Sequence, residues 1–226
     1  EERVKYDEVR NFYWQKLNPR IKDGGVNHSK IEILGALLRL RQICCHVGLV
    51  EKNKDVASSA KLDLLIEQLQ TIIKEGHKAL VFSSFTSLLK LLTQQLHQKG
   101  ISFEYLDGQT KDREERVNNF QTNAEVPLFL LSLKAGGVGL NLTAADYVFI
   151  IDPWWNPAAE SQAIDRCYRI GQTKKVFAYK LIAKNTVEEK ILKLQERKKN
   201  LANQIISSDA SILKELSVDD LADLFS

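Results

Sequence analysis

The chain has 226 residues, of which 44% are hydrophobic, and it carries 32 lysines and arginines against 29 acidic residues. This length and apolar content favour a folded globule with one sizeable core over a disordered chain. The net charge of +3 permits a polyanionic partner without requiring one. No apolar run approaches the ~18 residues of a membrane span, and no segment resembles a signal peptide, so we expect no membrane partner.

The three cysteines, Cys44, Cys45 and Cys167, are an odd number with two adjacent members. This usage suits a reducing, intracellular environment better than a disulfide framework. Cys44-Cys45-His46 has no second pair at ligand spacing, so a buried helix end is a better interpretation than a metal site. The chain contains no methionine, which indicates a piece of a longer protein or residues missing from the sequence.

Helical patterns open the chain over residues 1–17 and 29–45, separated by a stretch rich in helix breakers at 18–25. Beyond them, helix and strand patterns alternate, which predicts an α/β fold with a parallel sheet and helices on both faces. Ligands of such folds gather at the carboxyl ends of the strands. The helices are expected at 59–75, 86–99 and 111–121, and the strands at 79–82, 102–106, 127–133, 147–151 and 176–182.

Polar loops follow three of these strands. The first strand ends at Ser83-Ser84-Phe85-Thr86 and the second at Asp107-Gly108-Gln109-Thr110. Each could bind phosphate, although capping of the next helix is the default interpretation. The third strand leads into residues 132–142, where three glycines allow backbone to approach a ligand and Lys134 supplies positive charge.

The glycine cluster matches neither of the familiar nucleotide loops. A dinucleotide fingerprint would need glycine at position 142, which is Leu142. The phosphate-loop pattern G-x-x-x-x-G-K-[ST] occurs nowhere in the chain. The main nucleotide site is therefore absent from this sequence.

Residues 162–172 read Gln-Ala-Ile-Asp-Arg-Cys-Tyr-Arg-Ile-Gly-Gln, and the residues around them predict one continuous helix. That helix would place Gln162, Arg166 and Arg169 on one face, and a pair of guanidinium groups suits a phosphate. Ordinary surface arginines are the alternative. The helix signals are Asn156 as N-cap, Pro157 at the first helical position, Glu160 in the first turn and Gly171 just past the end.

These segments resemble the motifs of the Swi/Snf-type DNA translocases. Residues 162–172 are similar to the last helicase motif of that family, and Asp152-Pro-Trp-Trp-Asn-Pro157 with Leu131 to Asn141 to the motif before it. Ala79 to Thr86 resembles the first motif of the second lobe, and Leu38 to Cys44 the linker that enters it. Thr186 to Gln195 resembles the closing helix, and Leu213 to Phe225 the ends of bacterial members.

The resemblance implies the second of two RecA-like lobes. Residues 1–57 would be a helical extension from the missing first lobe, 58–186 the helicase C-terminal lobe, and 187–226 a bracing helix with an acidic tail. ATP and Mg²⁺ would be bound mainly by the first lobe, whose phosphate loop and acids this chain lacks. The isolated chain is therefore expected to be inactive, although the full-length protein would be an ATPase.

The resemblance also implies roles for individual residues. Arg169 would be the main arginine finger on the γ-phosphate and Arg166 its partner, with Gln162 orienting them. Gly139 and Asn141 would line the nucleotide cleft, and no residue would bind a metal. Trp154 and Trp155 could stack on a base, but packing is the preferred interpretation. The residues expected along the DNA backbone are Ser83, Thr86, Thr110, Ser132 and Lys134.

The expected partners are the first lobe and double-stranded DNA, bound without sequence preference, with a DNA-bound protein as a further candidate. The expected location is on DNA, in the nucleoid of a bacterium or the nucleus of a eukaryote. Two other functions stay open. The chain could be a helicase-like interaction scaffold, although Arg166 and Arg169 argue against that, or an RNA helicase lobe, whose usual His-Arg-Ile-Gly-Arg run is absent.

Overall fold

A computed structural model describes residues 2–51, 59–136, 140–154, 157–168, 171–199 and 217–225. The chain divides into two compact units, one made of residues 1–59 with 182–226 and the other of residues 60–181. Two of the three segments expected from sequence, 1–57 and 187–226, thus belong to the same unit. The predicted domain boundaries themselves stay a prediction. None of the helices described is both long and apolar enough to cross a membrane.

The smaller unit is helical and brings the two ends of the chain together. It contains α1 (Glu2–His28), α2 (Lys30–Cys45), the short 3₁₀ helix η1 (Val47–Leu49), α8 (Val187–Lys199) and α10 (Val218–Phe225). The Tyr6 hydroxyl on α1 accepts a hydrogen bond from the backbone N–H of Val187 at 2.7 Å. Trp14 stacks on Phe225 with ring centroids 5.8 Å apart. Segments from both ends of the sequence therefore share one core.

The first helix continues through the stretch where two helices were predicted to separate. α1 runs without interruption to His28 although Pro19 lies inside it, so the predicted break at 18–25 is wrong. A proline inside a helix costs ~3 kcal/mol because it removes one backbone hydrogen bond and crowds the preceding turn. Leu17 and Ile21, on either side of it, are buried, and this burial offsets the cost.

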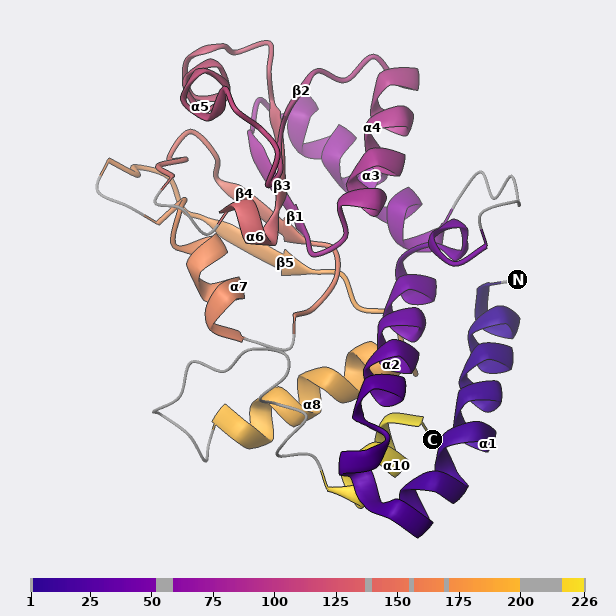
Figure 1. Cartoon of the computed structure of the whole chain (residues 1–226). Helices are drawn as coiled ribbons and strands as arrows, with labels where there is room; N and C mark the ends of the chain where they lie inside the picture. The colour runs from indigo at the N-terminus through magenta and orange to yellow at the C-terminus, as the bar shows by residue number, and fades with distance from the viewer. Residues whose placement is uncertain are drawn as a thin grey trace. The chain divides into compact units, whose positions relative to one another are not determined.

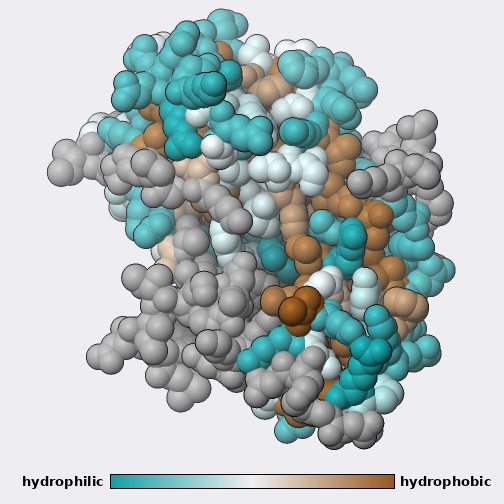
Figure 2. Space-filling view, viewed as in Figure 1, coloured by the Kyte–Doolittle hydropathy of each residue, from teal (hydrophilic) through white to brown (hydrophobic). Residues whose placement is uncertain are grey.

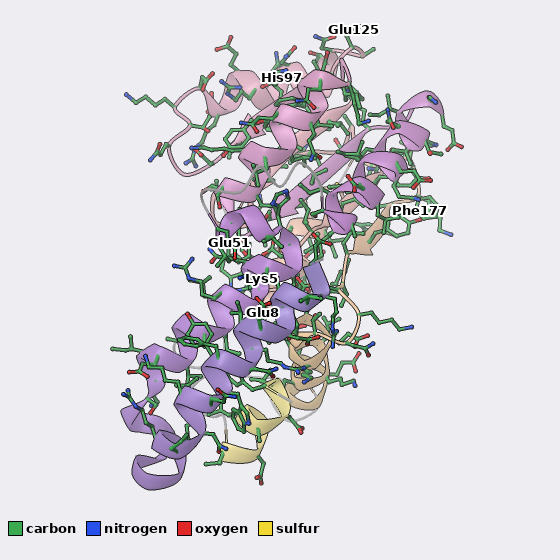
Figure 3. All side chains as sticks on the ribbon, turned by 90° about the vertical axis from the view of Figure 1, so that its right-hand side faces the viewer. Lys5, Glu8, Glu51, His97, Glu125 and Phe177 are labelled. Carbon is green, nitrogen blue, oxygen red and sulfur yellow. The ribbon has the colours of Figure 1, made fainter. Side chains whose placement is uncertain are left out.

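Ion pairs join α1 to the segments beside it. The Arg20 guanidinium lies 2.6 Å from the Glu32 carboxylate on α2. The Lys5 ammonium lies 3.3 Å from Glu8 and 2.5 Å from Glu51, which follows η1, and the three side chains lie together (Figure 3). These exposed or half-exposed pairs contribute little each. The buried apolar side chains of this unit carry its stability, and include Leu17, Ile33, Leu37, Leu40, Val187, Ile191, Leu221 and Leu224.

The larger unit is built on a five-stranded parallel sheet, as the alternation of patterns predicted. Its strands are β1 (Ala79–Ser83), β2 (Phe103–Leu106), β3 (Leu128–Ser132), β4 (Tyr147–Ile150) and β5 (Phe177–Lys180), in the order β2-β3-β1-β4-β5. All four neighbouring pairs are parallel. Every residue of β1 and β3 is buried, because both faces of these central strands are covered.

Helices cover both faces of this sheet, which confirms the predicted fold class. α3 (Ala60–Lys74) and α4 (Thr86–Gln98) lie on one side, with α5 (Arg113–Thr122), α6 (Leu133–Gly136) and α7 (Pro157–Ile164) on the other (Figure 1). α3 and α4 each bury one apolar stripe, as amphipathic helices do. Hydrophilic residues predominate over α4 and α5 (Figure 2).

β5 forms one edge of the sheet and is exposed along its whole length. Phe177, labelled in Figure 3, stacks on Tyr147 of β4 with ring centroids 5.2 Å apart. Tyr179 stacks on Phe149 at 5.4 Å. Cross-strand aromatic pairs of this kind stabilise neighbouring strands by about 0.2–1 kcal/mol each, so they fix the register of the edge strand.

Candidate functional site at the carboxyl edge of the sheet

The loops after β1 and β4 meet through one buried carboxylate. Asp152, two residues beyond β4, accepts a hydrogen bond from the Ser83 hydroxyl at 2.5 Å and from the backbone N–H of Ser84 at 3.1 Å. The Ser84 hydroxyl also donates to it. Asp152 is fully buried, and β1 and β4 are neighbours. Asp152 therefore links the first motif of the lobe to the Asp-Pro-Trp-Trp-Asn-Pro motif.

This contact changes how the first loop is understood. Ser83 was expected on the DNA track, but it is fully buried, and its hydroxyl also accepts from the Phe85 N–H at 3.0 Å. The N-cap of α4 is Phe85, with no side-chain cap bond, so the default interpretation of a hydroxyl cap is wrong. Thr86 is exposed on the first turn of α4, which leaves its hydroxyl accessible.

The second loop is a turn closed around Asp107. The Asp107 carboxylate accepts from the Gln109 N–H at 2.8 Å, and the Thr110 hydroxyl accepts from the Asp107 N–H at 3.0 Å. Partial burial acts to raise the pKa of Asp107, but the Gln109 N–H and the neighbouring hydroxyls hold that pKa below its ordinary value. The N-cap of α5 is Asp112 rather than Thr110, so the predicted threonine cap is wrong.

The third loop begins at Ser132, where β3 ends. Ser132 is buried, and its hydroxyl accepts from the Ala135 N–H at 3.2 Å, which satisfies a donor at the start of α6. The Lys134 side chain and Gly139 lie outside the described residues. Asn141 is exposed, and its carbonyl accepts from the Gln121 side chain at 3.3 Å.

The arginine segment is not one continuous helix. α7 begins at Pro157, as predicted, and has Glu160 in its first turn, but it ends at Ile164. The Cys167 N–H bonds to the Ile164 carbonyl three residues back, and the Arg166 carbonyl accepts from Leu142 N–H at 3.2 Å. The helix therefore ends at Ile164, because the Cys167 N–H closes a turn and the Arg166 carbonyl bonds to the loop after α6 instead of to a further helical turn.

The early end of α7 overturns the predicted common face. Gln162 is exposed on α7, whereas Arg166 is buried, with 4% of its surface exposed, in the turn beyond it. Asn156, the predicted N-cap, and Arg169 lie outside the described residues. Gly171 has a positive φ of +106°, but it lies seven residues beyond the end of α7, so the prediction that it follows the helix directly is wrong. The structure thus joins Arg166 to the loop that carries Asn141, through backbone rather than through a shared helix face.

Two side chains that had no predicted role, Asp146 and Gln172, join separate segments of this region. Asp146, buried at the start of β4, has a carboxylate oxygen 2.6 Å from His77 Nδ1 and 3.5 Å from the Lys174 ammonium. Gln172 donates to carbonyls of the loop before β4. Gln172 stood within the quoted motif, whereas no sequence pattern singles out His77 or Asp146, because their contact depends on the pairing of distant segments.

The remaining predictions concern the tryptophans and a metal site. Trp154 packs against the apolar core of the larger unit, which supports packing over base stacking, and Trp155 lies outside the described residues. Among the described residues, no group of three or more His, Cys, Asp or Glu could hold a metal ion.

The parallel sheet, with motif loops at its carboxyl edge and an arginine segment beside them, defines a helicase C-terminal lobe. The family model of the helicase conserved C-terminal domain matches residues 60–171. The SWI2/SNF2 ATPase C-terminal domain of Sulfolobus solfataricus is 30% identical, with a TM-score of 0.76, and the alignment covers 99% of this chain and 92% of that chain. The chain belongs to the SWI2/SNF2 family and forms its C-terminal RecA-like lobe.

Two further relatives are longer than this chain. The ATPase core of the Sulfolobus solfataricus protein, solved in complex with double-stranded DNA, is 32% identical with a TM-score of 0.81, over 99% of this chain and 47% of that chain. The human lymphoid-specific helicase is 40% identical over 190 residues, which are 78% of this chain and 23% of that protein. The chain thus spans about a fifth of the curated relatives it matches.

Proposed function

We propose that this chain is the second motor lobe of an ATP-dependent translocase on double-stranded DNA. The observation that carries the proposal is the hydrogen bond from Leu142 N–H to the Arg166 carbonyl. It joins the arginine segment to the loop of Asn141, so the two segments that we assign to the nucleotide lie next to each other. The relatives named as ATP-dependent helicases, such as that of Schizosaccharomyces pombe, support the same function.

The residues present fit half of an ATP site. Bound ATP supplies a γ-phosphoryl group whose transfer spreads negative charge over its oxygens, and planar guanidinium groups stabilise that charge. We propose Arg169 as the principal finger, Arg166 as its partner and Gln162 as an orienting residue. Gly139 and Asn141 would line the cleft. Mg²⁺ would be held mainly by the first lobe.

The DNA track would follow the loops at the carboxyl edge of the sheet. Thr86, Thr110 and Lys134 are proposed to contact the DNA backbone, while the buried hydroxyls of Ser83 and Ser132 fix the loops from within. Hydroxyls, loop amides and a lysine contact phosphates rather than base edges, so we expect binding without sequence preference that weakens as salt rises. Closure and reopening of the two lobes would then move the protein along one strand.

An ATPase assay of the full-length protein tests the proposal. Turnover is measured without nucleic acid and with double-stranded DNA, single-stranded DNA or RNA. Double-stranded DNA should stimulate turnover most. Stronger stimulation by RNA would favour the RNA helicase alternative instead. Absence of turnover under all four conditions, with DNA binding retained, would favour the scaffold alternative and sink the motor assignment.

A further inference from the structure

The side chain of Gln172 joins the arginine segment to the loop before β4. Its amide nitrogen lies 2.9 Å from the Ala145 carbonyl oxygen, 3.1 Å from that of Thr143 and 3.2 Å from that of Cys167. Its amide oxygen accepts from the Lys174 N–H at 2.9 Å. The Gln172 amide thus donates through its nitrogen and accepts through its oxygen, whereas an ionised carboxylate at this position could only accept.

These contacts close both ends of the arginine segment onto a single loop. Arg169 lies in sequence between Cys167 and Gln172, and the Gln172 amide bonds to the Cys167 carbonyl. Arg166, just before Cys167, receives the hydrogen bond of the Leu142 N–H. The segment that carries both arginines is therefore tied at each end to residues 142–145.

That loop is in turn held from its other side by α5. The Gln121 amide oxygen accepts from the Ala144 N–H at 2.7 Å, and its amide nitrogen lies 3.3 Å from both the Asn141 carbonyl and the Thr143 hydroxyl. The two glutamine amides together contact four backbone groups of this loop, namely the carbonyls of Asn141, Thr143 and Ala145 and the N–H of Ala144. A displacement at either amide would be transmitted to the arginine segment.

We propose that Gln172 is a positioning residue for the arginine fingers, which holds the segment around Arg166 and Cys167 against the loop 141–145. This proposal rests on the proposed function, because it acts through Arg166 and Arg169. Gln172 is a better residue here than glutamate of the same shape. A carboxylate would place a negative oxygen against three carbonyl oxygens and lose both N–H donors.

The substitution Gln172→Glu in the full-length protein tests the proposal. We expect the DNA-stimulated kcat to fall by about 10²-fold, the scale of a small misplacement of a catalytic group, with little change in the KM for ATP or in DNA affinity. Without nucleotide, hydrogen–deuterium exchange should become faster at Leu142 and Ala144. Gln98→Glu, at the exposed end of α4, is the matched control and should leave all of these quantities unchanged.

A second variant separates positioning from general damage to the fold. Gln172→Ala removes the donors without adding charge, and should also lower kcat but not DNA affinity. In a protein that already carries Arg169→Ala, Gln172→Glu should cause little further loss of kcat, because both substitutions disable the same interaction. A full additional loss in that background, or a parallel loss of DNA affinity and melting temperature, would overturn the positioning role.

The outcome also distinguishes this inference from the proposed function. Normal turnover in Gln172→Glu, combined with a large loss in Arg169→Ala, contradicts the positioning role and leaves the motor assignment intact. Near-normal turnover in Arg169→Ala contradicts the motor assignment itself, and the positioning role falls with it. A large loss of turnover in each single variant, with little further loss when the two are combined, supports the positioning role and the motor assignment together.

Discussion

The Ser83 hydroxyl donates to the Asp152 carboxylate at 2.5 Å, and neither side chain is accessible to solvent. The two residues are 69 positions apart in the sequence. They meet because β1 and β4 are neighbours, so Ser83 at the end of β1 and Asp152 just beyond β4 lie at the same edge of the sheet. This hydrogen bond joins the loop after β1, which is part of the proposed DNA track, to the Asp-Pro-Trp-Trp-Asn-Pro motif.

Asp152→Asn should destabilise the larger unit and weaken DNA binding. The new amide group would turn a donor toward the Ser84 N–H or the Ser83 hydroxyl, and a mismatched buried polar group costs about 1–3 kcal/mol. Thermal unfolding and DNA titration would measure the two effects. Ser83→Ala, which leaves the Ser84 contacts in place, should have a smaller effect, and Asp63→Asn on the exposed side of α3 should have none. An Asp152→Asn protein with unchanged melting and DNA affinity would refute this prediction.

Arg169→Ala should lower the DNA-stimulated ATPase of the full-length protein by ~10³-fold or more, the scale of other arginine fingers. Arg169→Lys should be nearly as damaging, because a compact ammonium group cannot reproduce the planar fork of donors. Turnover at saturating ATP and DNA is the measurement. Lys175, exposed at the edge of the larger unit, offers a control: Lys175→Ala removes one positive charge and should leave turnover near that of the unaltered protein.

The isolated chain should release no appreciable phosphate from ATP, with or without DNA. Its sequence has no phosphate loop, and its described residues include no carboxylate cluster for Mg²⁺. Phosphate release by the purified chain, compared at equal concentration with the full-length protein, is the measurement. Hydrolysis at a comparable rate would mean that the chain binds the phosphates itself, and the two-lobe site would have to be abandoned.

The Cys167 thiol should resist alkylation over the neutral and mildly basic range. Burial, with a smaller contribution from Asp146, raises its pKa from 9.0 to about 12. Because the thiolate is the reactive form, a higher pKa lowers reactivity at a given pH. At pH 9 only about one thiol in a thousand would be ionised. Mass spectrometry after iodoacetamide treatment at pH 7–9 should find the half-buried Cys44 labelled first. Equal labelling of Cys167 and Cys44 would contradict the prediction, and denatured protein should label at all three cysteines.

The sheet was predictable because its strands and helices are marked by local apolar patterns and by polar loops. Strand 79–82 and helix 86–99 agree with β1 and α4 to within one residue. The ends of α1 and α7 were not predictable from propensity. Pro19 is tolerated because flanking side chains are buried, and α7 stops early because backbone groups of residues 166 and 167 bond elsewhere.

The candidate site was predictable in its location but not in the roles of its side chains. The residues expected to contact ligand included Ser83 and Ser132, whose hydroxyls turn inward to backbone and carboxylate groups. Short hydroxyl side chains bond equally well to a neighbouring loop or to a phosphate, and only the three-dimensional arrangement decides between them. Asp152 and Gln172 were present in the quoted motifs, but their partners lie on other segments and are not visible in the sequence.

The order of the strands sets the distance between the loops of the proposed DNA track. The loops after β2, β3 and β1 leave three adjacent strands, and neighbouring strands lie about 4.8 Å apart, so the outer two loops begin roughly 10 Å from each other. One strand of DNA advances about 3.4 Å per nucleotide. These three loops therefore match about three nucleotides of one strand, measured along the duplex axis, and we expect one lobe to contact a stretch of that length.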